Sequence, residues 1–220
     1  MTDINRAIEQ LEWNREPRSL YEPVEYTLAS GGKRLRPTLA MLASQMFEGN
    51  DEDVLPAALA LEVFHNFTLL HDDVMDRAEV RRGRPTVHVL WNDNTAILSG
   101  DQMMIEAYRL LSGVPEEKLP KVLRMFNDMA TGICEGQQYD MDFEARQDVS
   151  LEEYMNMIRL KIFRSVSSTQ CGFPVGVVRS QCVVFSEYGR NRCESWPRLK
   201  RYFTISGVLY SSSSSAPTEL

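Results

Sequence analysis

Asp72 and Asp76 are four residues apart, so on a helix they would share one face, with Cβ atoms roughly 5–6 Å apart. Carboxylates this close repel each other unless a cation lies between them, and hard oxygen ligands suit Mg²⁺. Apolar residues, among them Phe64 and Phe67, lead directly into the pair. The pattern favours a substrate with a charged head and a hydrocarbon tail, and a hydrated acidic helix end is the alternative.

Basic residues gather in two loops, one on each side of this stretch. Residues 31–37 (GGKRLRP) place three cations directly before a predicted helix. A helix N-terminus attracts anions and glycines permit close backbone approach, so a diphosphate is the expected ligand. Residues 81–85 (RRGRP) follow the acidic helix, and arginine forks bind phosphate oxygens. For both loops the alternative is an ordinary solvated basic segment.

Three further residues could belong to the same site. His65 lies seven residues before Asp72, two helical turns away and close to the same face. It is either a core histidine or a group that binds the ligand. Gln137 and Asp140, three residues apart on a later predicted helix, could support the site from behind, although a polar surface is the favoured interpretation.

The elements that must position these residues are helices. Apolar residues recur at helical spacing through most of residues 1–161, and no alternating strand pattern persists. Ser150 and Glu153 form a predicted capping box that opens the last of these helices. Pro56 fits the first turn of the helix that carries the carboxylates. An all-α domain is therefore expected, with helices at about 3–13, 19–30, from 37 onward, 53–76, 93–112, 117–143 and after 150.

Bulk composition excludes some functions. A net charge of −7 on 220 residues argues against a nucleic-acid partner. The first residues are polar, so no signal peptide is expected, and no apolar run approaches the ~20 residues of a membrane span. The four cysteines show neither close pairing nor zinc spacing, which favours free thiols in a reducing cytosol. We therefore expect a cytoplasmic protein.

Beyond residue 161 the character of the chain changes. Residues 1–161 contain 28 acidic and 17 basic residues, whereas residues 162–220 contain three acidic and seven basic residues. The later segment has a run of five serines, poor helical periodicity and no aspartate. We expect two parts, a helical domain over 1–161 and an atypical tail over 162–220.

Four motifs together resemble the trans-isoprenyl diphosphate synthases, also called polyprenyl synthetases, which include the farnesyl and geranylgeranyl types. They are residues 31–37 (GGKRLRP), 65–76 (HNFTLLHDDVMD), 81–88 (RRGRPTVH) and 136–140 (GQQYD). Each is weak alone, but their ordered occurrence is specific. The resemblance implies an all-α isoprenoid-synthase-type bundle around a central cavity and a homodimer. It also implies Mg²⁺-dependent condensation of isopentenyl diphosphate with an allylic diphosphate such as the dimethylallyl, geranyl or farnesyl compound.

The resemblance also assigns roles to residues. The allylic diphosphate would be held by Arg81, with Lys161 reaching it from the far side, and Gln137 would support substrate binding. Asp72 and Asp76 would ligate Mg²⁺ and Asp73 would support them, so that these aspartates and Lys161 form the catalytic set. Isopentenyl diphosphate would be held by Lys33, Arg36, His65 and Arg82.

In this family the residue five before the first aspartate often limits product length, and here it is the bulky Phe67. This implies a short product of the C15 or C20 type. At ~100° per residue, however, Phe67 lies well away from the face of Asp72, and Phe64 and Thr68 lie nearer to it. All three remain candidates for the residue that limits chain length.

One feature of the family is missing. Its members carry a second aspartate-rich motif on a later helix, but residues 162–220 contain no aspartate. Residues 188–191 (YGRN) nevertheless resemble the sequence just ahead of that motif. Our hypothesis is that much of 162–220 is translated out of frame, and sequencing the locus for an acidic, helical alternative frame tests it.

The expected function is therefore short-chain prenyl transfer in isoprenoid biosynthesis. The alternative is a catalytically impaired or truncated family member, or a non-catalytic subunit that partners an intact synthase. A terpene cyclase is less favoured, because it needs no isopentenyl site, and a plain helical interaction protein would require four accidental motifs.

Overall fold

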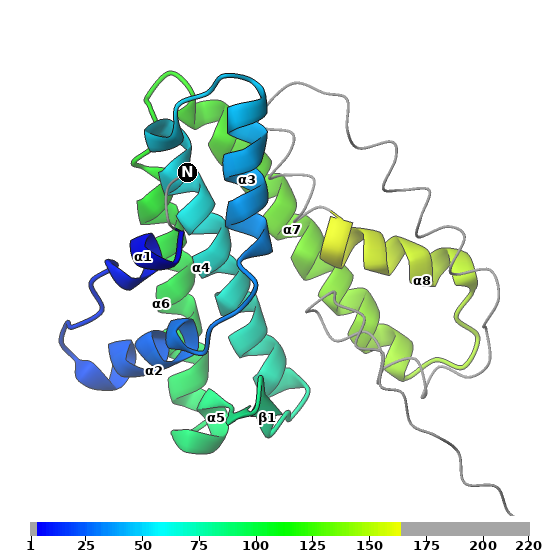
Figure 1. Cartoon of the computed structure of the whole chain (residues 1–220). Helices are drawn as coiled ribbons and strands as arrows, with labels where there is room; N and C mark the ends of the chain where they lie inside the picture. Colours follow the sequence, from blue (N-terminus) through cyan, green and yellow to red (C-terminus); the bar gives the residue numbers. More distant parts are fainter. Residues whose placement is uncertain (1–3, 164–220) are drawn as a thin grey trace, which may run out of the picture. The chain divides into compact units, whose positions relative to one another are not determined.

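The computed structural model describes residues 4–163, and within them the chain is all-α around one long helix, α4 (Asp51–Met75) (Figure 1). α4 packs most extensively against α6 (Asp93–Leu111) and next against α3 (Leu35–Met46). α2 (Arg18–Ala29) covers α6. The predicted all-α class is confirmed, and most predicted helices appear within a few residues of their expected bounds.

α4 is central because it is apolar around most of its circumference, which a helix can be only when neighbours surround it. Its buried residues follow one another almost without a break from 58 to 66. Asn50 caps its N-terminus by accepting a hydrogen bond from the Glu52 amide, and acidic residues fill its first turn. Pro56 stands at the sixth position, one turn further in than predicted, because the helix begins at Asp51 rather than 53.

Helix α4 is also long and apolar enough to cross a membrane, contrary to the expectation that no segment would be. About two thirds of its most apolar window is buried inside the protein. A core helix passes the same test of length and composition, so this is weak evidence for a membrane span.

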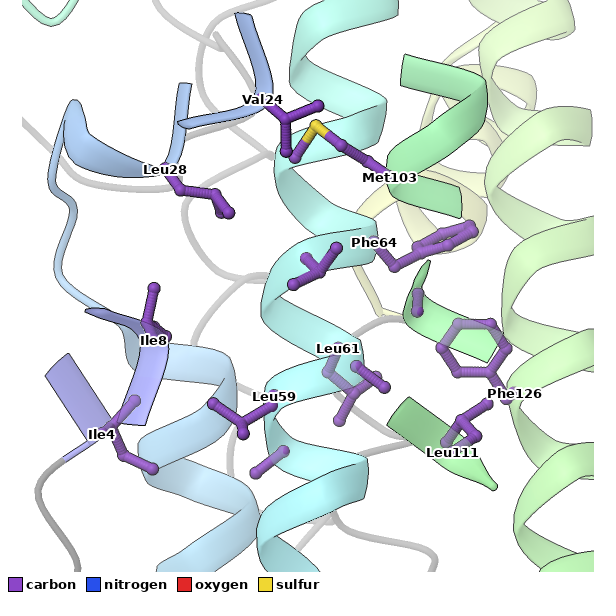
Figure 2. Packing of buried hydrophobic residues seen from close by; sticks show 14 of the residues in the cluster. Ile4, Ile8, Val24, Leu28, Leu59, Leu61, Phe64, Met103, Leu111 and Phe126 are labelled. Carbon is purple, nitrogen blue, oxygen red and sulfur yellow. The ribbon is translucent and has the colours of Figure 1, made fainter. Parts of the chain in front are cut away.

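The core joins α4 to helices on both sides (Figure 2). Ile4 and Ile8 of α1 (Ile4–Glu9) pack toward Leu59 on one side. On the other side the ring of Phe64 lies 5.0 Å from that of Phe126, edge to face. Such aromatic pairs contribute about 0.5–1.5 kcal/mol beyond their buried area. α1 is shorter than the predicted helix at 3–13.

Helix α7 (Leu119–Glu144) is followed by α8 (Leu151–Ile158), and the chain then continues as a π-helix, η1 (Arg159–Phe163). The capping box at Ser150 is confirmed: its hydroxyl accepts from the Glu153 amide, and the Glu153 carboxylate accepts from the Ser150 amide. η1 packs against α7. The π-helix was not predicted, because a one-residue change of helical pitch leaves little trace in a hydrophobic pattern.

Two short elements between α4 and α6 were also not predicted. β1 (Val80–Arg81) and β2 (Arg84–Pro85) form an antiparallel hairpin, and α5 (Val87–Leu90) follows it. Arg82 and Gly83 form the turn with φ of 53° and 76°, the pair of positive values that a two-residue hairpin turn requires. Strands of two residues are too short to show alternation. The predicted tail lies, from residue 164 onward, outside the described residues.

Candidate active site

The C-terminal end of α4 carries charges of the wrong sign. Asp72 and Asp73 are buried, with 4% and 6% exposure, and Asp76 caps the helix. The last turn of this helix contains no basic residue. A helix C-terminus bears about half a negative charge and favours cations. These carboxylates therefore cost stability where they stand, unless a cation joins them.

The raised pKa of Asp72 reflects this cost in stability. Burial, followed by repulsion from Asp76, raises it from 3.8 to about 6, against the opposing effects of Lys161 and Arg81. Burial also raises the pKa of Asp73, opposed by Arg81. The sequence prediction that Asp72 and Asp76 lie on one face is supported by this interaction and by the hydrogen bond of 2.8 Å from the Asp76 amide to the Asp72 carbonyl.

Arg81 lies directly against the aspartates. Its Nε and Nη2 are each 2.7 Å from Asp73 Oδ1, and Nη2 is 3.6 Å from Asp72 Oδ2. The hairpin presents this side chain because β1 follows α4 after a few residues. Arg81 therefore holds Asp73 in place and leaves Asp72 and Asp76 as the carboxylates with the strongest mutual repulsion.

A second charged region lies around the N-terminus of α3. Gly31, Gly32 and Arg34 all have positive φ, at 73°, 152° and 48°. The Arg82 guanidinium donates to the Gly31 carbonyl. A Cβ at Gly32 would lie 3.2–3.3 Å from that guanidinium, and the positive φ of this residue favours glycine there. The turn of the hairpin and the loop before α3, far apart in sequence, thus meet at one place.

Arg36 and His65 complete this cationic region. Burial lowers the pKa of Arg36, with Glu62 opposing and Arg82 adding to the effect. Burial also lowers the pKa of His65 well below 6.5, and the arginines 36, 82, 81 and 34 lower it further. His65 is thus neutral at pH 7 among several cations. Such a concentration of positive charge is what a bound anion would neutralise.

Lys161 reaches the carboxylates from η1. Its Nζ is 2.7 Å from Asp140 on α7, and its charge lowers the pKa of Asp72. α7 and η1 approach closely because residue 136 is glycine: a Cβ there would lie 2.7 Å from Lys161 Cγ and 2.9 Å from its backbone nitrogen. The motif at 136–140 thus supplies both the close approach and the partner carboxylate of Lys161.

The remaining predicted residues lie near these two regions with fewer contacts. Gln137 Nε2 is 4.0 Å from the Met75 sulfur at the end of α4. Lys33 is exposed beside the cationic region. Of the candidates for chain length, Thr68 donates to the His65 carbonyl at 2.8 Å. Phe64 and Phe67 contact each other edge to face, with ring centroids 5.2 Å apart.

A cavity of about 310 Å³ lies between α3, α4, α6 and α7, toward the start of α4. Its apolar lining includes Val54, Leu61 and Phe126. Leu61 precedes Asp72 by eleven residues, or about 16 Å of helix. The sequence predicts a substrate with a hydrocarbon tail beside the carboxylates, whereas this cavity lies beyond the contact of Phe64 with Phe126.

The donor set fits Mg²⁺ bound through a substrate. Among residues 4–163 no cluster of three or more acidic, histidine or cysteine side chains could hold a metal by itself. Mg²⁺ is typically held by one or two carboxylates together with substrate phosphates and water. Asp72 and Asp76 supply two such carboxylates, and burial followed by repulsion from Asp76 raises the pKa of Asp72, which a bound cation would lower.

Sequence reasoning missed a buried group behind the cationic loop, formed by Arg34, Glu62 and Asn66. Arg34 Nη1 is 2.6 Å from Glu62 Oε1, and Asn66 donates to the same carboxylate oxygen at 3.1 Å. A signal was present, because Glu62 is an acid in the middle of an apolar run, and such a charge requires a buried partner.

Comparison with known proteins gives the class of this site. The family model described as polyprenyl synthetase matches residues 17–182. The chain is 41% identical over 191 residues to a geranylgeranyl diphosphate synthase of Methanosarcina mazei, covering 85% of this chain and 59% of that protein. It is 42% identical over 160 residues to a geranylgeranyl pyrophosphate synthase of Geoglobus acetivorans, covering 72% and 50%.

Solved structures agree. A geranylgeranyl pyrophosphate synthetase from Pyrococcus horikoshii superposes with a TM-score of 0.74 at 35% identity, covering 86% of this chain and 59% of that one. The all-α helical fold is therefore that of an isoprenyl synthase. The chain belongs to the polyprenyl synthetase family, whose members generally depend on Mg²⁺.

The matched region bears on the predicted division of the chain. The chain spans about half to three fifths of the length of these curated relatives. The family match continues to residue 182, past the predicted boundary at 161. That boundary, the missing aspartate motif and the out-of-frame hypothesis concern residues that mostly lie outside the described structure, and they stay predictions.

Proposed function

We propose that this chain catalyses Mg²⁺-dependent condensation of isopentenyl diphosphate with an allylic diphosphate to give a short prenyl diphosphate. The observation that carries this proposal is the pairing of two charge regions of opposite sign. One is the buried carboxylate group at Asp72, and the other is the arginine cluster around neutral His65. The first region suits a metal-bound diphosphate and the second a diphosphate bound directly by cations.

The two regions divide the two substrates. The allylic diphosphate would bind at the end of α4, where Asp72 and Asp76 hold Mg²⁺ and Arg81 and Lys161 add positive charge. Asp73 would fix Arg81, and Gln137 would approach from α7. Isopentenyl diphosphate would bind at the loop before α3, through Lys33, Arg36, His65 and Arg82. The relatives' names support substrates of this class.

The chemistry follows from the charges. Mg²⁺, when bound, would stabilise the negative charge that develops on the departing diphosphate. Arg81 and Lys161 would stabilise the same charge from the protein side. The isopentenyl double bond attacks the allylic carbon, and a proton is then lost from the new chain. The apolar side chains of α4 would exclude water, which could otherwise capture the allylic cation.

The growing tail would lie along α4 from Asp72 toward Phe64, Phe67 and Thr68. Phe64 and Phe126 stand between the carboxylates and the apolar cavity. A chain stopped at this contact would be short, which supports a C15 or C20 product. The comparisons favour prenyl transfer over a catalytically impaired or non-catalytic chain.

We also propose that the protein acts as a homodimer in the cytosol. Helix α6 exposes apolar side chains, with Leu98 60% and Ile105 51% exposed one above the other, and Ile97 beside them. A second copy would cover them. Analytical ultracentrifugation should give a dimer that Leu98→Glu converts to monomer, and a monomeric wild-type protein would refute this part.

Binding measurements test the division of the sites. Asp72→Ala should abolish Mg²⁺-dependent binding of a non-reactive allylic thiolodiphosphate and leave isopentenyl diphosphate binding within about twofold of the parent, since a uniform loss would mean shared sites. Lys33→Ala should do the reverse. Asp148→Ala and Lys118→Ala, whose side chains pair with Arg146 and Asp53, are the matched controls. Equal losses for both ligands in Lys33→Ala would refute the division.

A further inference from the structure

The loop that presents Lys33 and Arg36 rests on a buried polar group. Arg34, between them in sequence, turns inward and is only 8% exposed. Its Nη1 lies 2.6 Å from Glu62 Oε1, and its Nη2 donates to the Leu28 carbonyl at 2.8 Å. One guanidinium therefore ties the end of α2, the start of α3 and the middle of α4 together.

Asn66 completes the arrangement from the next turn of α4. Its amide donates to the Glu62 carbonyl at 2.8 Å and to Glu62 Oε1 at 3.1 Å, and it is 1% exposed. These contacts fix the rotamer of Glu62. Arg34 donates to this carboxylate through Nη1 alone, and we infer that Asn66, by holding the acceptor oxygen, sets the position that Arg34 must adopt.

The backbone of the loop is strained where this contact is made. Arg34 is the N-cap of α3 and has φ 48° and ψ 35°, a left-handed conformation that residues with a Cβ seldom adopt. Its side chain does not cap the helix. Strain of this kind costs about 1–3 kcal/mol and persists only where the surroundings impose it. The same residue makes the buried ion pair with Glu62.

We propose that Arg34, Glu62 and Asn66 form an anchor that fixes the backbone from which Lys33 and Arg36 extend, and so sets the affinity for isopentenyl diphosphate. This inference rests on the proposed function. Glu62 is also the acid whose charge acts on both Arg36 and Arg82. Arg34, Glu62 and Asn66 are positioning residues, because they are buried behind the loop.

Two variants test the anchor. Arg34→Met removes the guanidinium fork, and Glu62→Gln keeps the shape of the side chain and removes its charge. Each should raise the Kd for isopentenyl diphosphate about tenfold, since a small displacement of binding groups is costly. Binding of a non-reactive allylic thiolodiphosphate with Mg²⁺ should change by less than about twofold, because that site lies at the other charge region. Arg34→Gly, which relieves the backbone strain, should lose affinity as Arg34→Met does.

Controls separate the possible outcomes. Arg15→Met removes an arginine that pairs with Glu106 on α6 and should leave both affinities unchanged. If both ligands weaken together in folded Glu62→Gln, or if Arg34→Met and Glu62→Gln bind isopentenyl diphosphate normally, the anchor is refuted. Lys33→Ala, measured in the same titration, distinguishes this failure from that of the proposed function. If Lys33→Ala also binds normally, the isopentenyl site itself is misplaced and the inference falls with it.

Discussion

His65 and Asp72 are two turns apart on one helix, and the pKa values of their side chains are shifted in opposite directions. Asp72 is a buried acid next to Asp76, and burial followed by repulsion from Asp76 raises its pKa to about 6. His65 is a base surrounded by arginines, and its pKa is lowered well below 6.5. In both residues burial disfavours the charged form of the side chain. Side chains with strongly shifted pKa values are typical of sites that bind a charged ligand.

The stability of the free protein should reflect the environment of His65. Its pKa is lower in the folded than in the unfolded protein, so below pH 6.5 the unfolded chain binds more protons. The free energy of unfolding therefore falls as pH falls below 6.5, by up to about 1.4 kcal/mol per pH unit from this group. Urea denaturation at pH values from 7.5 to 5.0 should show a steeper decline for wild type than for His65→Gln.

The difference between the two proteins isolates His65, because Asp72 and Asp73 titrate in both. The raised pKa of Asp72 acts in the opposite direction, lowering stability as pH rises from about 4 to about 6, and the raised pKa of Asp73 acts in the same sense as that of Asp72. His88→Gln is the control, since the His88 imidazole contacts Thr86 rather than the arginine cluster. Parallel pH profiles for wild type and His65→Gln would contradict a buried neutral His65.

The ends of α3 and α4 bear charges that are unfavourable for the helix dipole. α3 begins with cations at its positive end, and α4 ends with carboxylates at its negative end. Each arrangement costs about 0.3–1 kcal/mol per charge relative to the reverse. These costs could be recognised in the sequence, because charge and helix boundary are both local. The contacts between side chains of different helices depend on the fold and cannot be recognised locally, and so the pairing of Arg34 with Glu62 was missed.

The contact of α7 with η1 gives a test in which two effects oppose each other. Gly136→Ala should gain about 1 kcal/mol from helix propensity. The added Cβ would, however, meet Lys161 at 2.7–2.9 Å, including its backbone nitrogen. Overpacking of this kind costs about 1–3 kcal/mol. We expect the clash to dominate, so that the free energy of unfolding falls and allylic diphosphate binding weakens as Lys161 is displaced.

The control is Thr131→Ala on the exposed side of the same helix, which gains propensity without a clash. Chemical denaturation should show Thr131→Ala as neutral or slightly more stable and Gly136→Ala as less stable. A stabilised Gly136→Ala variant with normal allylic binding would show that the close approach of α7 and η1 has no role in the site.

At the scale of the whole molecule, the sequence predicted the helices and the family but not the arrangement of the interior. Helical periodicity and capping depend on residues close together in the sequence, and the predicted capping box at Ser150 is confirmed. The hairpin at 80–85, the π-helix and the position of the cavity depend on contacts between distant segments. The helical class and the family are thus accessible from the chain alone, whereas the positioning of charged groups requires the fold.

The most direct test of the account is a condensation assay on the full chain. Purified protein is incubated with isopentenyl diphosphate, geranyl diphosphate and Mg²⁺, and prenyl products are identified by mass spectrometry. We predict Mg²⁺-dependent formation of C15 or C20 prenyl diphosphate that is lost in Asp72→Ala and retained in Asp148→Ala. Binding of both substrates without any product from the wild-type chain would contradict the proposed activity and favour a non-catalytic family member.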